Sequence, residues 1–321
     1  MDQKMIDKIE SEIRQIQYPQ EPKELYEPIR YILSLGGKRI RPLVSMMAAE
    51  LFGMPKDNRS VLHLAKSLEI FHNFSLVHDD IMDEAPLRRG MPTVHEKWTR
   101  DVAILSGDVM LVRAYQELIE TKSDRLVDLL KQFNESAILV CEGQQLDMNF
   151  EQEEEVSLDR YLKMIELKTA ELLACSLKMG AILAGASEKD AKALYQFGIN
   201  LGLAFQIQDD YLDSFADSAK FGKQIGGDIL ANKKTYLMVT CRQQADPDQR
   251  DRMDQLLKLK GDEKVEKVLN LYKEVGVDQA CQQAIEHYYQ KALHDLGQVQ
   301  GEEQAKEPLA SLAAMIMKRD H

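Results

Sequence analysis

Two short acidic clusters share one pattern and lie far apart in the chain. Each cluster reads Asp-Asp-x-x-Asp, the first from Asp79 to Asp83 and the second from Asp209 to Asp213. Residues four apart lie on the same face of a helix, so each cluster would present two carboxylates in one direction. Like charges one turn apart destabilise an isolated helix by about 0.2–0.5 kcal/mol, a cost that a bound cation would offset. Because Mg²⁺ favours carboxylate and water ligands and commonly bridges to phosphates, the pattern predicts a magnesium-bound diphosphate held from two helices.

Basic residues beside the first cluster predict an anion at the same place. Arg88 and Arg89 follow the cluster directly, after Pro86, where we expect the helix to end. Guanidinium groups bind phosphate oxygens through paired hydrogen bonds. His72 lies seven residues before Asp79, which places it on the helical face that carries the carboxylates.

A second anion site is predicted upstream. The Gly36-Gly37 turn is followed by Lys38, Arg39 and Arg41, just before a predicted helix. Cationic side chains and the partial positive charge of a helix N-terminus both favour a bound anion. The spacing of a P-loop is absent, so this turn is not predicted to be a nucleotide site of that kind.

Composition narrows the class of protein. The chain has 321 residues, of which 44% are hydrophobic, enough for a sizeable core. Its net charge of −12 and the lack of a basic face give no indication of nucleic-acid binding. The four cysteines are too widely spaced for a predicted zinc site or disulfide framework. The acidic charge is typical of a cytoplasmic protein. No run of about 20 apolar residues is present, so we expect no membrane span.

Helices are predicted almost throughout, because apolar residues recur at helical spacing and prolines number only 9. No alternation typical of strands stands out. The clearest helical stretches are 43–53, 59–84, 97–120, 125–149, 158–184, 188–216 and 277–298. Since the two aspartate clusters must converge to share a metal site, we expect one all-α domain over residues 1–321, built as a helical bundle.

Further motifs complete a recognisable set. Lys168-Thr169 lies between the clusters, Gln206 precedes the second cluster, and Lys223 and Lys233 follow it. In this order the motifs resemble those of the trans-isoprenyl diphosphate synthases, the polyprenyl synthetase family, over nearly the whole chain. The resemblance implies an isoprenoid synthase-type helical bundle around a deep central cavity, usually as a homodimer. It also implies a Mg²⁺-dependent, head-to-tail condensation of isopentenyl diphosphate with dimethylallyl, geranyl or farnesyl diphosphate.

The resemblance carries roles to individual residues. The metal ligands would be Asp79, Asp83, Asp209 and Asp213, with Asp80 and Asp210 supporting them. Isopentenyl diphosphate would bind at Lys38, Arg41, His72 and Arg89. The allylic diphosphate would bind at Arg88, Lys168, Thr169, Gln206, Lys223 and Lys233. Lys168 is also expected to act in catalysis, together with Asp79, Asp83 and Asp209.

Product length is expected to depend on Phe74 and Ser75, which precede Asp79 by five and four residues. Ser75 lies one turn, about 5.4 Å, below Asp79 and is small. Phe74 is bulky and is either the floor of a product tunnel or an ordinary core residue. Within the family, an aromatic residue at this position resembles the short-chain synthases that make geranylgeranyl diphosphate, with farnesyl diphosphate as the second candidate.

Two other functions remain open from the sequence. A class I terpene cyclase or head-to-head synthase also uses Asp-Asp-x-x-Asp, although a cyclase usually has a different second motif. A non-catalytic helical subunit of a partner synthase would not need both metal motifs.

Overall fold

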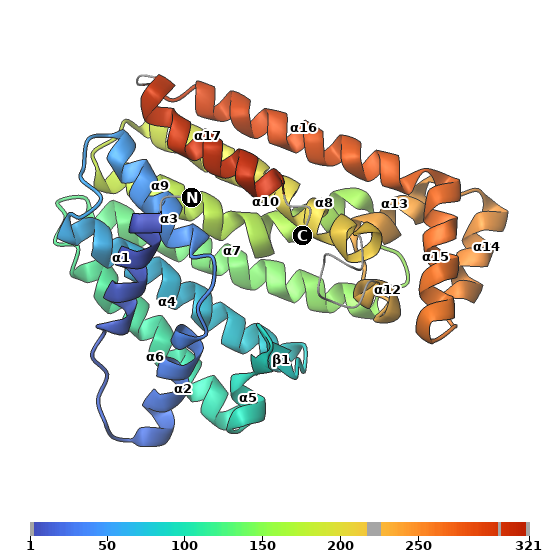
Figure 1. Cartoon of the computed structure of the whole chain (residues 1–321), viewed down its shortest axis with the longest axis horizontal. Helices are drawn as coiled ribbons and strands as arrows, with labels where there is room; N and C mark the ends of the chain where they lie inside the picture. The colour runs from blue at the N-terminus through green and yellow to red at the C-terminus, as the bar shows by residue number, and fades with distance from the viewer. Residues whose placement is uncertain (1–2, 217–225, 301–302, 319–321) are drawn as a thin grey trace. The chain divides into compact units, whose positions relative to one another are not determined.

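The computed structural model describes residues 3–216, 226–300 and 303–318. Over these ranges the chain is almost entirely helical, which confirms the predicted all-α class (Figure 1). In the same ranges the only strands are β1 (Leu87–Arg88) and β2 (Met91–Pro92), which pair antiparallel. The residue contacts divide the chain into two compact units, each of which contains one of the aspartate clusters.

The first unit comprises residues 1–136, 175–195 and 299–309. Its complete helices are α1 (Gln3–Arg14), α2 (Lys23–Ser34), α3 (Ile40–Leu51), α4 (Arg59–Met82), α5 (Val94–Lys97) and α6 (Arg100–Ile119). Helix α4 carries the first aspartate cluster and packs most extensively against α6. The two helices approach closely at Gly107, where a β-carbon would lie 2.2 Å from His78 Nε2.

The second unit comprises residues 137–174, 196–298 and 310–321. Its complete helices are α8 (Leu158–Ile165), the π-helix η1 (Glu166–Ala170), α12 (Gly227–Leu230), α13 (Tyr236–Gln244), α14 (Pro247–Leu256), α15 (Gly261–Val275) and α16 (Val277–Gly297). Four longer helices have residues in both units: α7 (Leu126–Gln152), α9 (Glu171–Leu183), α10 (Glu188–Phe215) and α17 (Glu303–Met317).

The long periodic stretches are correctly predicted, with ends that differ by a few residues. They correspond to α3, α4, α6, α7, α10 and α16. Ser187 caps α10, because its hydroxyl accepts a hydrogen bond from the Asp190 backbone N at 3.1 Å. The stretch predicted over 158–184 is helical from Leu158 to Leu183, but it is not one regular α-helix, because the π-helix η1 lies between α8 and α9.

Several elements were not predicted. Helices α1, α2, α13, α14, α15 and α17 lie outside the predicted stretches. Helix α1 nevertheless buries Met5, Ile9 and Ile13 at helical spacing. The strands β1 and β2 have two residues each, too few to show alternation. No helix in the described ranges is long and apolar enough to cross a membrane. The single domain over residues 1–321 stays a prediction.

Candidate active site

The first aspartate cluster forms the last turn of α4. The helix ends at Met82, and the backbone N of Asp83 donates to the Asp79 carbonyl oxygen at 2.9 Å. The predicted spacing is therefore helical, and the carboxylates of Asp79 and Asp83 belong to one turn. The Asp79 side chain keeps 21% of its surface exposed, and Asp83 is exposed. This turn presents two carboxylates that a metal ion can reach.

Asp80, the inner residue of the cluster, has a different role. It is buried, and its two carboxylate oxygens accept hydrogen bonds from Arg88 Nε at 2.8 Å and Nη2 at 2.7 Å. Burial raises the pKa of Asp80, while the Arg88 hydrogen bonds oppose that rise. Arg88 Nη2 also lies 3.7 Å from Asp79 Oδ2. The structure therefore holds Arg88, expected to bind the allylic diphosphate, against the aspartate cluster through Asp80.

The four residues expected to bind isopentenyl diphosphate come from three segments of the first unit. Arg41 Nη1 lies 3.1 Å from His72 Nε2, and Arg89 donates a hydrogen bond to the Gly36 carbonyl oxygen. Gly37 has φ 139°, a conformation that other residues rarely adopt, and a β-carbon there would lie 2.9 Å from the guanidinium carbon of Arg89. Lys38 is exposed on the same turn.

Charge at this cluster is set by burial and by the neighbouring arginines. Burial, followed by repulsion from Arg41, lowers the pKa of His72 well below its usual 6.5, so its imidazole is neutral near pH 7. A neutral imidazole still donates one N–H. Burial lowers the pKa of Arg41 to about 10, which leaves its guanidinium charged near pH 7.

The second aspartate cluster lies in α10, in the second unit. Asp209 is exposed, whereas Asp213 is partly buried and accepts a hydrogen bond from the Asp228 backbone N at 3.0 Å. Burial, and then repulsion by Asp213, raises the pKa of the Asp228 carboxyl to about 6. Three carboxylates that repel one another favour a bound cation. Asp228 was not among the predicted ligands, although it directly follows the Gly226-Gly227 pair after the second cluster.

Asp210 resembles Asp80 in being an internal acceptor. It is buried and accepts hydrogen bonds from the Tyr161 hydroxyl, from the Tyr236 backbone N at 2.8 Å and from Gln206 Nε2 at 3.0 Å. Burial outweighs these hydrogen bonds and raises the pKa of Asp210 to about 7. The sequence contained no signal for Tyr161, which lies 49 residues from Asp210.

The π-helix η1 carries Lys168 and Thr169. Lys168 Nζ lies 2.5 Å from Asp147 Oδ2, and the Thr169 hydroxyl donates to Gln206 Oε1 at 3.1 Å. A π-helix places an extra residue in a turn and commonly occurs at functional sites. Thr169 and Gln206, both predicted for the allylic site, are thus in direct contact.

Of the last two predicted residues, Lys233 and Lys223, the structure describes only Lys233. Lys233 is exposed, with its Nζ 3.8 Å from Asp228 Oδ1. Its backbone N also donates to the Asp228 carbonyl oxygen at 3.0 Å. Lys223 lies outside the described residues.

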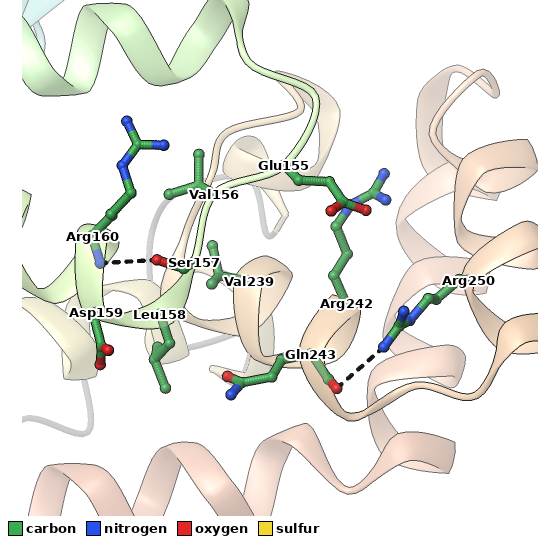
Figure 2. A pocket seen from close by; sticks show the side chains of 10 residues that line it. All are labelled: Glu155, Val156, Ser157, Leu158, Asp159, Arg160, Val239, Arg242, Gln243 and Arg250. Atoms are coloured by element: carbon green, nitrogen blue, oxygen red, sulfur yellow. Dashed lines mark hydrogen bonds between the residues drawn. The ribbon is translucent and has the colours of Figure 1, made fainter.

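A pocket elsewhere in the second unit contains none of the predicted residues. It has a volume of about 540 Å³ and lies between the start of α8 and helices α13 and α14 (Figure 2). Figure 2 shows Arg160 on the opposite side of the pocket from Arg242 and Arg250. Arg160 pairs with Glu153 at 2.8 Å and Arg242 with Asp254 at 2.5 Å. Because none of the predicted site residues lines it, this pocket is not the site that the sequence motifs predict.

The polyprenyl synthetase family model matches residues 22–275, which include every predicted site residue. The chain belongs to this family. It is 36% identical to the short chain isoprenyl diphosphate synthase of Methanothermobacter thermautotrophicus, over 94% of this chain and 92% of that relative. The family assignment makes the chain a trans-prenyltransferase.

Solved structures of the family share the fold. A crystal structure of a geranylgeranyl pyrophosphate synthase superposes with a TM-score of 0.91 at 42% identity, over 99% of this chain and 97% of that one. A polyprenyl synthase from Caulobacter crescentus, solved with calcium and isoprenyl diphosphate, gives a TM-score of 0.83 at 28% identity, over 100% and 95% of the two chains. The predicted isoprenoid synthase-type fold is confirmed.

Proposed function

We propose that this chain condenses isopentenyl diphosphate with an allylic diphosphate, head to tail, and releases geranylgeranyl diphosphate. The observation that carries the proposal is that the two aspartate clusters share the same arrangement. In each cluster the inner aspartate is buried and hydrogen-bonded, while the first aspartate keeps an accessible carboxylate. The similarity to a structure named geranylgeranyl pyrophosphate synthase supports the product. The synthase relatives give no support to a cyclase or a non-catalytic subunit.

The carboxylates present fit Mg²⁺. No group of three His, Cys, Asp or Glu side chains in the described part of the chain forms a complete metal cage. Mg²⁺ does not need one, because it usually takes one or two protein carboxylates and completes its shell with water and substrate phosphates. We assign Asp79 and Asp83 in the first unit, and Asp209 and Asp213 in the second, as the ligands. Bound Mg²⁺ would neutralise the charge that develops on the departing diphosphate. The calcium in the Caulobacter crescentus structure supports a divalent cation.

The cationic side chains divide between two diphosphates. Isopentenyl diphosphate is assigned to Lys38, Arg41, His72 and Arg89. The allylic diphosphate is assigned to Arg88, Lys168, Thr169, Gln206, Lys223 and Lys233. Fixed positive charges stabilise the allylic leaving group as its C–O bond breaks, because they need no reorganisation at that moment. The isopentenyl double bond then attacks the allylic carbocation, and loss of one proton restores a neutral product chain. The released diphosphate accepts that proton.

A homodimer is proposed from the surface of α6. Leu105, Val112 and Ile119 are spaced by seven residues, which places them on one face of the helix. Their exposed fractions are 57%, 57% and 51%. Exposed apolar side chains aligned on one face of a helix are typical of protein interfaces.

We also propose that the protein is located in the cytoplasm.

Two substitutions test the metal assignment. We expect Asp79→Ala and Asp209→Ala each to lower kcat by on the order of 10³-fold, because each removes a carboxylate that holds Mg²⁺. Asp124→Ala, which removes an exposed carboxylate outside both clusters, is the matched control and should keep parental activity. The assay measures chain-length-resolved products with saturating Mg²⁺, and chelation of the metal should abolish turnover. Parental kcat in either cluster variant would contradict the proposal.

A further inference from the structure

Arg39 differs from the two cations on either side of it. Lys38 is exposed and Arg41 is partly exposed, but the Arg39 side chain has 0% of its surface accessible. Its Nε donates to Glu10 Oε1 at 2.7 Å, and its Nη2 donates to the Leu33 carbonyl oxygen at 2.8 Å. Its Nη1 donates to Glu69. All three nitrogens of the guanidinium are therefore engaged inside the protein, so Arg39 does not serve as a ligand for a substrate phosphate.

The backbone at Arg39 shows that this arrangement is imposed by its surroundings. Arg39 has φ 48° and ψ 36°, a left-handed conformation, and it directly precedes the first residue of α3. Gly36 and Gly37 also have positive φ, of 73° and 139°. A non-glycine residue persists in this conformation only where neighbouring contacts hold it. The buried contacts of Arg39 thus define the shape of the turn that carries Lys38 and Arg41.

Glu69 is the centre of the buried charges. It has 2% of its surface exposed and accepts hydrogen bonds from Arg39 and from Asn73 Nδ2 at 2.8 Å. It lies three residues before His72 on α4, and thus on the same side of the helix. Its negative charge also favours the charged form of Arg41 and of Arg89, acting against the effect of burial on their pKa values. Glu69 therefore neutralises a group of arginines that would otherwise repel one another.

Glu10 brings the N-terminal helix into this network. Helix α1 packs on α3 and α4, and it buries Met5, Ile9 and Ile13. Glu10 lies between these apolar residues in sequence and reaches Arg39. Helix α1 lies outside residues 22–275, which match the family model, so the family assignment gives it no role.

We propose that the Glu10–Arg39–Glu69 ion network positions the turn of residues 36–41, and that α1 is for this reason required for tight binding of isopentenyl diphosphate. The inference rests on the proposed assignment of Lys38 and Arg41 to that substrate. Glu10, Arg39 and Glu69 are positioning residues. They act by holding the cations that contact the diphosphate.

Kinetics of single variants test the proposal. We expect Glu10→Ala to raise the KM for isopentenyl diphosphate by about tenfold, the effect of weakening one hydrogen bond to a charged group. The KM for farnesyl diphosphate and kcat should stay within about twofold of the parent. Glu10→Gln keeps an oxygen acceptor for Arg39 and should recover part of the loss. Glu12→Ala is the matched control, because Glu12 is on the same helix and pairs with Lys8 at 2.9 Å instead.

Arg41→Ala separates the inference from the proposed function. A raised KM for isopentenyl diphosphate in Arg41→Ala, together with parental values in Glu10→Ala, would overturn the role of α1 alone. An unchanged KM in Arg41→Ala would overturn the substrate assignment, and the inference with it. An equal rise of both KM values in Glu10→Ala would reduce the network to a structural role. If Glu10→Ala does not fold at the assay temperature, as judged by circular dichroism, Glu10→Gln replaces it. This variant lacks the charge and should raise the KM for isopentenyl diphosphate by a smaller factor, and a parental KM would overturn the role of α1.

Discussion

At the scale of single residues, the carboxylates within each aspartate cluster have two separate tasks. Asp80 and Asp210 are buried and hydrogen-bonded to Arg88 and Tyr161, whereas Asp79 and Asp209 keep accessible oxygens. Burial raises the pKa of both inner aspartates, which suits groups that position neighbours more than groups that bind a metal. The repeated pattern therefore encodes a supporting residue as well as ligands.

His72 provides a prediction about pH at this scale. Its pKa in the folded protein lies well below 6.5, mainly because of burial and then because of Arg41. Between that lowered value and 6.5, the unfolded chain binds a proton that the folded chain does not. The free energy of unfolding therefore falls as the pH falls through this window.

We expect His72→Asn to lose that dependence. Urea denaturation between about pH 5 and 7 should show a smaller change in the free energy of unfolding for His72→Asn than for the parent. His287→Asn, at an exposed position on α16, should keep the parental pH dependence. Identical slopes in the parent and His72→Asn would contradict a neutral, partly buried His72.

At the scale of elements, the π-helix η1 depends on two close contacts. A β-carbon at Gly143 of α7 would lie 2.3 Å from the Lys168 backbone N. A β-carbon at Gly202 of α10 would lie 2.5 Å from the Ala170 Cα. Backbone atoms cannot move aside as easily as the end of a flexible side chain. The two glycines therefore determine where Lys168 and Thr169 lie.

Gly143→Ala should therefore damage catalysis through η1. We expect kcat/KM for the allylic diphosphate to fall on the order of 10–100-fold, because small displacements of positioned groups are costly. The matched control is Gly297→Ala in α16, where an added β-carbon meets nothing within 4 Å. That control should keep its activity and gain about 0.4–1 kcal/mol in stability. Parental kinetics in Gly143→Ala would show that η1 tolerates the displacement.

Helix α4 also carries the proposed determinant of product length. Phe74 is partly exposed, and its ring lies 5.5 Å from that of Phe71 and 4.8 Å from that of His78. Its place in the tunnel floor stays a prediction.

Truncation at Phe74 should lengthen the product. We expect Phe74→Ala to release prenyl diphosphates at least one isoprene unit longer than those of the parent, and Ser75→Phe to release shorter ones. Phe74 is only partly buried, so its truncation should cost less than the about 3–5 kcal/mol of a fully buried ring. A lower Tm is expected in either case and does not discriminate. The deciding measurement is chromatography of the dephosphorylated products. If both variants are active and product length is unchanged, Phe74 is an ordinary core residue and does not set product length.

At the scale of the whole molecule, the apolar face of α6 predicts the oligomeric state. Leu105→Glu places a charge among Leu105, Val112 and Ile119, and a charge buried at an interface without a partner is strongly unfavourable. We expect this variant to shift from dimer to monomer in size-exclusion chromatography with light scattering. Gln283→Glu adds the same charge at an exposed position on α16 and should leave the mass unchanged. If the parent protein itself has the mass of a monomer, the proposed homodimer is wrong.

The sequence by itself determined the features that depend on neighbours within one or two turns. These are the long amphipathic helices and the shared turn of Asp79 and Asp83, because helical spacing directly places residues three, four or seven apart. Only the tertiary structure decided which cations face inward. Arg39 and Lys38 are adjacent and chemically similar, yet Arg39 is buried because Glu10 and Glu69 lie 29 and 30 residues away in sequence and beside it in space. The same holds for Tyr161 with Asp210 and for Lys168 with Asp147, at separations of 49 and 21 residues. A periodic pattern records which face of a helix is apolar, but it does not record which distant charge will meet that face once the helices pack.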